Sequence, residues 1–358
     1  MTRDEVQERC RALIIGPLPP PLHGMSLATE ALADHVDAIS SVTRIDVGPG
    51  KARRTYHVRR IVRVAFAVVR VIVNRRRARY LYLACDGGAG MLYSLVLVAA
   101  GRIAGYEVFL HHHSYVYISH KKRLMTAIVR AGGARCHHIV ACTTMARDLR
   151  DAYGPTVQAR IVSVAYALPS ARDRHAVSRP LRLGHLSNLS VEKGLAVAIA
   201  TADALGAEMA GARLVLAGPA TSPNDRALIE AAVAGGAEYW GPATEEEKHR
   251  FYSSIDVFLF PSRYRHESFG LVAWEAAAHG VPVIAFRNGC LTQEALGDGG
   301  LVLEPNDDFV DRAVGQLREW ARDPALFQRA SACATRAAAR ARDAGNRQLD
   351  ELARLLAS

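Results

Sequence analysis

Residues 260–285 constrain the fold more than any other stretch, because two apolar strands there flank a short helix. The first strand runs into a turn that carries Glu267, and Ser268 is predicted to cap a helix that opens at Phe269-Gly270. Glu275 lies about one and a half turns further along that helix. A strand, a helix and a second strand in this order indicate a parallel sheet.

The start of this helix is predicted to bind an anion. The first amides of a helix have no partner within it and together carry roughly half a positive charge, so the amides of Phe269, Gly270 and Leu271 suit a diphosphate. Glu267 stands just outside the helix, beside whatever the phosphate is attached to. Glu275 can hold a pair of vicinal hydroxyls, as a ribose offers. The pattern therefore predicts a nucleotide sugar.

Glu267 and Glu275, set in ESFGLVAWEA and followed by GVPVIA, resemble the signature of retaining glycosyltransferase family 4. The resemblance implies that the first Glu contacts the transferred sugar, the loop amides hold the phosphates and the second Glu holds the ribose. Lys193 resembles the family's phosphate-binding Lys, which as a point charge would neutralise the departing diphosphate. Asn188 departs from the pattern, because the family usually has Arg five residues before that Lys.

Length and resemblance together predict two domains. The 358 residues, 50% of them hydrophobic, are enough to bury two cores. The resemblance implies an α/β protein of the GT-B class, with two Rossmann-like, doubly wound parallel-sheet domains that face each other across a cleft. We expect an N-terminal acceptor-binding domain at residues 1–172 and a C-terminal nucleotide-sugar-binding domain at 178–345, joined by a charged linker near 170–180. Residues 346–358 are expected to form a helix that returns to the first domain.

Several candidate residues follow strands of the N-terminal half. Gly24 follows the first strand, and the resemblance implies that the Gly-bearing loop there lines the acceptor side. Asp86, at the end of another strand, is an acceptor-site candidate because ligands of parallel sheets bind beyond the carboxyl ends of strands. Three successive His cannot hold one metal ion from an extended chain, since alternate side chains point to opposite faces. The resemblance places a His near the transferred sugar; His113 matches best, His111 shares its face, and His112 is expected to pack inside.

No cofactor and no metal ion are expected. The chain contains no Asp-x-Asp of the kind that coordinates a diphosphate-bound metal, and its six Cys show no metal spacing. Lys193 and a helix N-terminus would supply positive potential instead. Trp240 ends a short strand where the resembled family accommodates the nucleotide base, although a Trp there equally suits a core.

The charge of the chain is uneven. Residues 1–180 hold 27 Lys and Arg against 12 Asp and Glu, whereas the remainder holds 18 against 23. Such an asymmetry indicates that the basic half binds an anionic partner. Nucleic acid is not expected, because no helix-turn-helix, zinc finger or aromatic platform accompanies the basic residues. A membrane surface or a lipid-diphosphate acceptor fits better.

Residues 51–79 have a helical period that gathers Arg59, Arg60, Arg63 and Arg70 within about 100° of arc and leaves a broad apolar face. The Arg residues interrupt the segment too often for it to span a bilayer. Two interpretations remain open: a helix that buries its apolar face in the domain and exposes a basic edge, or an interfacial helix that draws the protein to anionic lipid.

The sequence therefore predicts a retaining, metal-independent hexosyltransferase. It would move a sugar from a UDP- or GDP-sugar to a hydroxyl of a glycan, glycolipid or lipid-linked acceptor in cell-surface polysaccharide or glycoconjugate synthesis, with Glu267, Lys193 and His113 as catalytic residues. A sugar-nucleotide epimerase on the same fold and a catalytically silent scaffold subunit are the alternatives. The Met1 end shows no signal-peptide core, so the cytoplasm is expected, with a peripheral place on the inner face of the cytoplasmic membrane as a further possibility.

Overall fold

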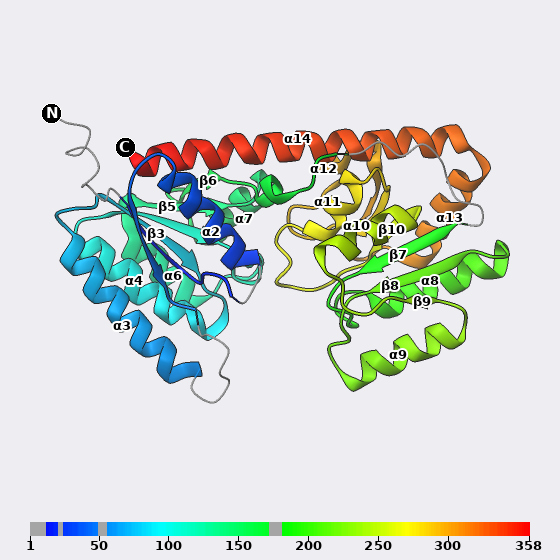
Figure 1. The fold of residues 1–358 in the computed structure, drawn as a ribbon, viewed down its shortest axis with the longest axis horizontal. Coiled ribbons are helices and arrows are strands. Elements are labelled where there is room, and N and C mark those ends of the chain that lie inside the picture. Colours follow the sequence, from blue (N-terminus) through cyan, green and yellow to red (C-terminus); the bar gives the residue numbers. More distant parts are fainter. Residues whose placement is uncertain (1–11, 21–23, 49–55, 172–180) are drawn as a thin grey trace. The chain divides into compact units, whose positions relative to one another are not determined.

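The structure, a computed structural model, divides the chain into two compact units (Figure 1). Unit 1 comprises Met1–Val164 with Ala344–Ser358, and unit 2 comprises Ala165–Asp343. The residues described are all except 1–11, 21–23, 49–55 and 172–180. Most of the predicted linker near 170–180 lies outside the described residues.

Unit 1 is built on a sheet of six parallel strands in the order β2-β1-β3-β4-β5-β6. The strands are β1 Ala12–Gly16, β2 Val42–Asp46, β3 Tyr80–Cys85, β4 Glu107–His112, β5 Cys136–Val140 and β6 Gln158–Ile161. The α-helices that lie wholly within this unit are α2 Gly24–Asp37, α3 Tyr56–Asn74, α4 Met91–Ile103, α5 Val116–Ser119, α6 Arg123–Gly132 and α7 Thr143–Tyr153. Central strands such as β1 and β5 are buried along their whole length, as apolar runs covered on both faces require.

Unit 2 repeats this plan with the strand order β12-β11-β10-β7-β8-β9, all pairs parallel. The strands are β7 Arg182–Leu186, β8 Arg213–Ala217, β9 Glu238–Tyr239, β10 Val257–Phe260, β11 Val283–Phe286 and β12 Gly300–Leu303. The α-helices are α8 Leu195–Glu208, α9 Pro223–Ala234, α10 Glu245–Ser254, α11 Leu271–Ala278, α12 Gln293–Leu296 and α13 Phe309–Arg322. The described residues of the two units also form short 3-10 turns: η2 Gly88–Gly90, η3 Gly133–Arg135, η4 Val164–Ala167 and η5 Gly297–Gly299.

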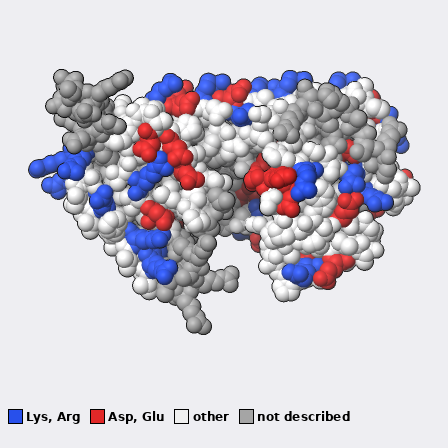
Figure 2. Space-filling view, in the orientation of Figure 1, with Lys and Arg blue, Asp and Glu red and all other residues white. Residues whose placement is uncertain are grey.

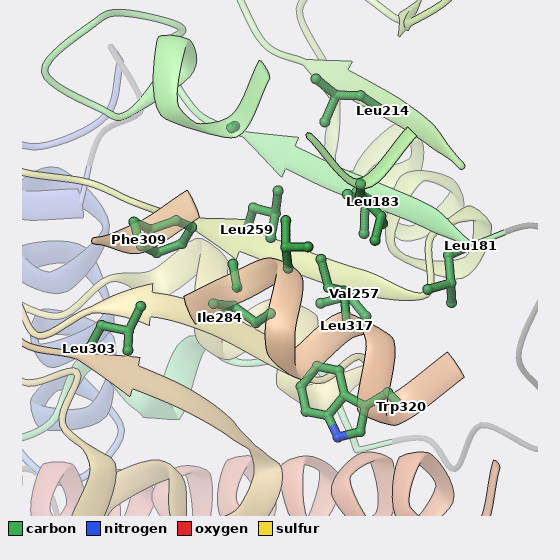
Figure 3. Close-up of a cluster of buried hydrophobic side chains, with 14 of the residues drawn as sticks. Leu181, Leu183, Leu214, Val257, Leu259, Ile284, Leu303, Phe309, Leu317 and Trp320 are labelled. Atoms are coloured by element: carbon green, nitrogen blue, oxygen red, sulfur yellow. The ribbon is translucent and has the colours of Figure 1, made fainter. Parts of the chain in front are cut away.

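The core of unit 2 lies where one face of its sheet meets the helices that cover it (Figure 3). Leu183, Val257 and Ile284 project from three adjacent strands and are fully buried. Leu317 and Trp320 of α13 cover them. Each buried aliphatic side chain stabilises the unit by about 1.5–3 kcal/mol, so this core holds the strand ends, and the loops that follow them, in fixed positions.

The last helix, α14, is continuous over Pro324–Ala357, a span of 34 residues. Its first part is held in unit 2, where the Ser331 hydroxyl donates to the carbonyl of Gly280 over 2.6 Å. Its last part belongs to unit 1, where the Gln348 side chain accepts from the Ser163 amide over 2.9 Å. One helix thus completes both units.

Helix α3 corrects the arrangement predicted for residues 51–79. Arg60, expected on the basic edge, is 7% exposed and forms an ion pair with Asp86. Arg63 pairs with Asp46 over 2.6 Å. The apolar face, which one of the two open interpretations buries in the domain, is largely exposed, because Arg60 and smaller residues of α3 take up the inward side. None of the helices in the described part of the chain is long and apolar enough to cross a bilayer.

Candidate functional site

The candidate site of unit 2 lies at the switch point of its sheet. Strands β7 and β10 are neighbours there, and the strand order runs away from them in opposite directions. The loop after β7 carries Asn188 and Lys193, and the loop after β10 carries Glu267. Ligands of open α/β sheets bind at such a point, beyond the carboxyl ends of the strands.

Gly194 brings the first of these loops close to the second. Its φ of +93° is one that side chains with a Cβ rarely adopt, and an added Cβ would lie 2.5 Å from the carbonyl oxygen of Pro261. Asn288 fixes the second loop from the other side, because its amide donates to the carbonyls of Ser262 and Tyr264 over 3.1 and 3.2 Å. Contacts with backbone carbonyls of unit 2 therefore hold both loops in place.

Glu267 and Lys193 form the centre of the site. The Lys193 Nζ atom lies 2.6 Å from Glu267 Oε2, and neither side chain is more than 20% exposed. The second carboxylate oxygen, Oε1, accepts from the Gly270 amide over 3.2 Å. The Lys193 ammonium also lies 4.2 Å from the ring centroid of Tyr264. The Glu267 carboxylate thus pairs with the Lys193 ammonium and accepts a hydrogen bond from the Gly270 amide at the helix start. An incoming phosphate would use the same cation and the same amide.

Ser268 is not the cap of helix α11, contrary to the sequence prediction. The helix begins at Leu271, and its N-cap is Gly270 at a φ of +74°, with no side-chain cap. The Ser268 carbonyl accepts instead from the Cys290 amide over 2.8 Å, which ties the loop to the turn after β11. Phe269 is buried and stacks on Trp274. The sharp turn at Gly270 is what allows the Glu267 carboxylate to reach back to the helix start.

Glu275 is 7% exposed and is held by two partners from helix α10. Lys248 Nζ donates to Oε1 over 2.9 Å, and the Tyr252 hydroxyl donates to Oε2 over 2.8 Å. Burial lowers the pKa of Lys248, but pairing with Glu275 and Glu245 outweighs it, and the net pKa is raised. Sequence reasoning missed both partners; their spacing of four, which puts them on one helix face, was the available signal.

Lys248, but not Glu275, lines a cavity of about 390 Å³. Its lining includes Asn188, Lys193, Lys248, Glu267 and Leu271. An adjoining cavity of about 520 Å³ shares Asn188 and Lys193 with it. The two volumes together match the size class of small-molecule sites.

Five other sequence candidates of unit 2 are not in the lining of the 390 Å³ cavity: Trp240, Ser268, Phe269, Gly270 and Glu275. Glu275 lines instead a cavity of about 180 Å³, together with Lys248 and Tyr252. Trp240 follows β9, is 39% exposed and meets Phe251 edge to face, with ring centroids 5.9 Å apart. The Phe269 amide lies in the loop before Leu271, which is the first residue of helix α11 and lines the cavity. Of the three predicted phosphate-binding amides, those of Gly270 and Leu271 stand at the helix start.

In unit 1 the candidates gather at the carboxyl edge of its sheet. In the β3–β4 register Cys85 lies opposite His112, so Asp86 and His113 follow at the same edge. Burial raises the pKa of Asp86 while Arg60 lowers it, and the net pKa is raised. Gly24 begins helix α2 in an exposed position with open space where a Cβ would be.

The two histidines predicted to share a face do so: the ring centroids of His111 and His113 are 4.1 Å apart. His111 is buried, and its Nδ1 lies 2.7 Å from the Tyr82 hydroxyl. His112 packs inside, as predicted, with its Nε2 2.9 Å from Nδ1 of His138. Burial and neighbouring His side chains hold the pKa of His111 and of His112 well below the usual range, so both are neutral near pH 7.

The described residues contain no group of three or more His, Cys, Asp or Glu placed to hold a metal ion. Two Lys side chains of the unit 2 site form ion pairs with Glu: Lys193 with Glu267, and Lys248 with Glu275 and Glu245. Such a site offers two cations, helix amides and two hydroxyl-binding carboxylates. That is a donor set for a phosphorylated, hydroxyl-rich ligand.

Comparison with known proteins agrees with this geometry. Residues 180–322 match the family model described as Glycosyl transferases group 1. Among curated proteins, glycogen synthase of Mycobacterium tuberculosis (strain CDC 1551 / Oshkosh) is 30% identical over 201 residues, 53% of this chain. The aligned part spans 47% of that relative, about half of its length.

Solved structures show the same fold over nearly the whole chain. Sucrose-phosphate synthase from Thermosynechococcus elongatus has a TM-score of 0.68 at 17% identity and covers 97% of this chain and 99% of its own. HepE of Anabaena, solved in complex with UDP-glucose, has a TM-score of 0.69 at 15% identity and covers 95% of this chain and 99% of its own. These similarities confirm the predicted GT-B fold.

Proposed function

We propose that this chain is a family 4, retaining and metal-independent glycosyltransferase. It would transfer a hexosyl group from a UDP- or GDP-sugar to a hydroxyl of a glycan, glycolipid or lipid-linked acceptor in the synthesis of cell-surface polysaccharide or glycoconjugate. The observation that carries the proposal is the pair of Lys193 and Glu267 at the start of α11, with Glu275 on the same helix, at the switch point of the sheet.

The comparisons support the donor class. HepE is described in complex with UDP-glucose, and glycogen synthase and sucrose-phosphate synthase are named for sugar products. Glu275 is buried beside Lys248 with its oxygens toward α10, a fixed acceptor suited to the ribose hydroxyls. No carboxylate is proposed as a nucleophile. The epimerase and scaffold alternatives have no observation in their favour.

The proposed step is a same-face displacement. The bond between the sugar C1 and the diphosphate oxygen breaks while the acceptor oxygen bonds to C1 on that same face. The acceptor proton passes to the departing diphosphate, whose charge is held by Lys193, Asn188 and the amides at the start of α11. Because Glu267 pairs with Lys193 and with the Gly270 amide, the diphosphate has to displace the carboxylate. The released carboxylate would then contact the transferred sugar, and His113 of unit 1 would position the reacting hydroxyls.

The test is a panel of UDP- and GDP-sugars with oligosaccharide and polyprenyl-diphosphate-linked acceptors, read out by release of UDP or GDP. We expect acceptor-dependent release that persists in EDTA, and a product whose anomeric configuration by NMR matches that of the donor. Loss of turnover on chelation, with recovery in Mg²⁺ or Mn²⁺, would refute the metal-independent mechanism. A changed sugar without transfer would favour the epimerase, and no release with any donor would favour the scaffold.

We also propose that the enzyme works as a peripheral protein at the inner face of the cytoplasmic membrane. The basic excess of residues 1–180, 27 Lys and Arg against 12 Asp and Glu, supports attraction to an anionic surface. A lipid-linked acceptor would also be met there.

A further inference from the structure

Helix α3 turns its apolar side to solvent. Seven of its large apolar side chains are exposed: Val58, Ile61, Val62, Phe66, Val69, Ile72 and Val73. Phe66 is 57% exposed and Val73 is 67% exposed. The side that faces the sheet carries instead Arg60, Val64, Ala67, Val71 and Asn74, all less than 9% exposed. A surface helix of a soluble domain normally has the opposite pattern, with its apolar stripe inward.

Helix α4 packs against α3 and extends this surface. Leu92, Val96 and Ile103 of α4 are exposed, Ile103 to 88%, and their spacing puts them on one face of that helix. Together the ten side chains form what we call the α3–α4 apolar face. Single exposed apolar residues need no explanation, but a continuous group of ten marks an interaction surface.

The charge around this face is almost entirely positive. Residues 58–135 contain fourteen Lys and Arg and two acidic residues, and both acidic side chains have cationic or His partners within the unit: Asp86 pairs with Arg60, and Glu107 with His137. Arg59, on α3, and Arg75, Arg76, Arg77 and Arg79, just after it, are exposed. Figure 2 shows white and blue side chains over the part of unit 1 where Figure 1 draws α3.

We propose that the α3–α4 apolar face docks on an anionic lipid bilayer. Helix α3 would lie in the plane of the interface, with Phe66 and its aliphatic neighbours at the boundary of headgroups and acyl chains. Arg59 and the arginines that follow α3 would lie at the lipid phosphates. An amphipathic helix with bulky apolar residues on one side and arginines beside them binds in this way. A second copy of the chain fits less well, because pairing two such faces would bring two basic surfaces together.

This mode differs from attraction by a basic edge alone. Arg60 is buried against Asp86, and the charge of the half-buried Arg63 is paired with that of Asp46, so these two arginines add little net charge to the surface. The apolar side chains therefore supply a part of the binding that salt does not screen, while the remaining arginines supply a part that it does. The inference depends on the surface of unit 1 and not on the reaction, so the two can fail separately.

The test is sedimentation of the full chain with phosphatidylcholine vesicles and with vesicles that contain phosphatidylglycerol. We expect at least tenfold tighter partition to the anionic vesicles at low salt, and binding that weakens in 0.5 M NaCl but persists. The double variant Val62→Ser/Phe66→Ser should bind at least tenfold more weakly. Its matched control is Ile39→Ser/Val233→Ser, which alters two exposed side chains away from this face and should bind like wild type.

A third variant tests the contribution of charge separately from that of the apolar face. Arg75→Gln/Arg76→Gln should show a smaller preference for the anionic vesicles, because two of the five exposed arginines are lost while the apolar face is intact. Circular dichroism would establish that every variant is folded, which is expected since the altered side chains are exposed. The proposal is refuted if Val62→Ser/Phe66→Ser binds like wild type, or if wild type binds neither vesicle. It is equally refuted if light scattering finds a dimer that this variant converts to monomer.

Discussion

Glu267 pairs with Lys193 and the Gly270 amide, the two groups that the proposed function assigns to the diphosphate, and this competition gives a prediction at the residue scale. In Glu267→Ala the Lys193 ammonium and the Gly270 amide are released, so UDP or GDP should bind as tightly as to wild type or tighter. The same substitution removes a contact to the sugar as its bond to phosphate breaks. We expect kcat to fall by roughly 10²-fold, the scale of one transition-state contact. Calorimetry and initial rates measure the two quantities.

Glu275→Ala is the comparison for that variant. A ribose contact is made in the ground state and the transition state alike, so its loss should raise the donor KM more than it lowers kcat, and should weaken binding of the nucleotide diphosphate. If both variants bind and turn over like wild type, helix α11 has only a structural role and the site lies elsewhere.

Lys248, which the sequence did not single out, gives a second prediction. Its ammonium is the cation paired with the buried Glu275 carboxylate, 2.9 Å away. In Lys248→Met the buried carboxylate loses that partner and keeps only the hydrogen bond that the Tyr252 hydroxyl donates to it. The donor KM should rise about tenfold, with kcat little changed. Arg250→Met, an exposed position on the same helix, is the control and should leave KM unaffected.

Residues of the site differed in how far sequence could predict them. Glu267 and Glu275 lie in one continuous motif, so their pattern was visible in a single stretch. Lys248 lies 27 residues before Glu275, on a helix with a polar composition like that of any surface helix. The pairing of Arg60 with Asp86 was equally hidden, because it depends on how α3 is rotated against β3. Contacts set by tertiary packing leave little trace in local spacing.

At the scale of elements, glycines set the position of the two site loops, and a matched pair of variants tests this. Gly194→Ala places a Cβ 2.5 Å from the Pro261 carbonyl oxygen at a φ of +93°, so we expect it to destabilise unit 2 by on the order of 2 kcal/mol. It should also reduce donor affinity by displacing Lys193. Gly206→Ala, in the exposed interior of helix α8, should stabilise by about 0.5–1 kcal/mol.

Urea titrations followed by tryptophan fluorescence report this difference, because all three Trp residues lie in unit 2. Equal midpoints for Gly194→Ala and wild type would mean that the loop relaxes away from Pro261 without cost. The loop would then not be the rigid support for Lys193 that its packing indicates.

Elements also show where periodicity is ambiguous. The sequence identified the helix in residues 51–79 but left open whether its apolar side is buried in the domain, which is the usual arrangement, or lies at a membrane interface. The structure shows that Arg60 points inward because Asp86, at the end of β3, offers it a partner. Helix α11 was placed correctly, but its start was taken two residues too early, because Ser268 is a common N-cap and the turn at Gly270 depends on a φ of +74°.

At the scale of the whole molecule, the fold was the most predictable property. Short apolar strands that alternate with helices specify parallel sheets, and the switch points follow from the strand order. The unit boundary was less accessible: unit 2 ends within the continuous helix α14, at Asp343, where neither composition nor a turn marks a change. The sequence of a helix that packs in two units shows no change at the boundary between them.

Buried neutral histidines in both units predict that stability falls in acid. Burial lowers the pKa of His138 in unit 1 and of His185 in unit 2 to about 4, from 6.5. The unfolded chain takes up a proton at each as the pH falls through 6.5, whereas the folded chain does not until about pH 4. The free energy of unfolding should therefore be constant above pH 7 and fall below 6.5, by about 1.4 kcal/mol per pH unit for each group.

Urea unfolding at a series of pH values measures this, with tryptophan fluorescence for unit 2 and circular dichroism for both units. His185→Gln should reduce the slope seen by fluorescence by about one proton, although the variant is less stable overall because it alters hydrogen bonds to Leu259 and Ser187. His266→Gln changes an exposed His of the same unit and should leave the slope as in wild type. A fluorescence midpoint that does not change between pH 7 and 5, or a slope unaltered in His185→Gln, would show that the buried ring of His185 is protonated in the folded chain.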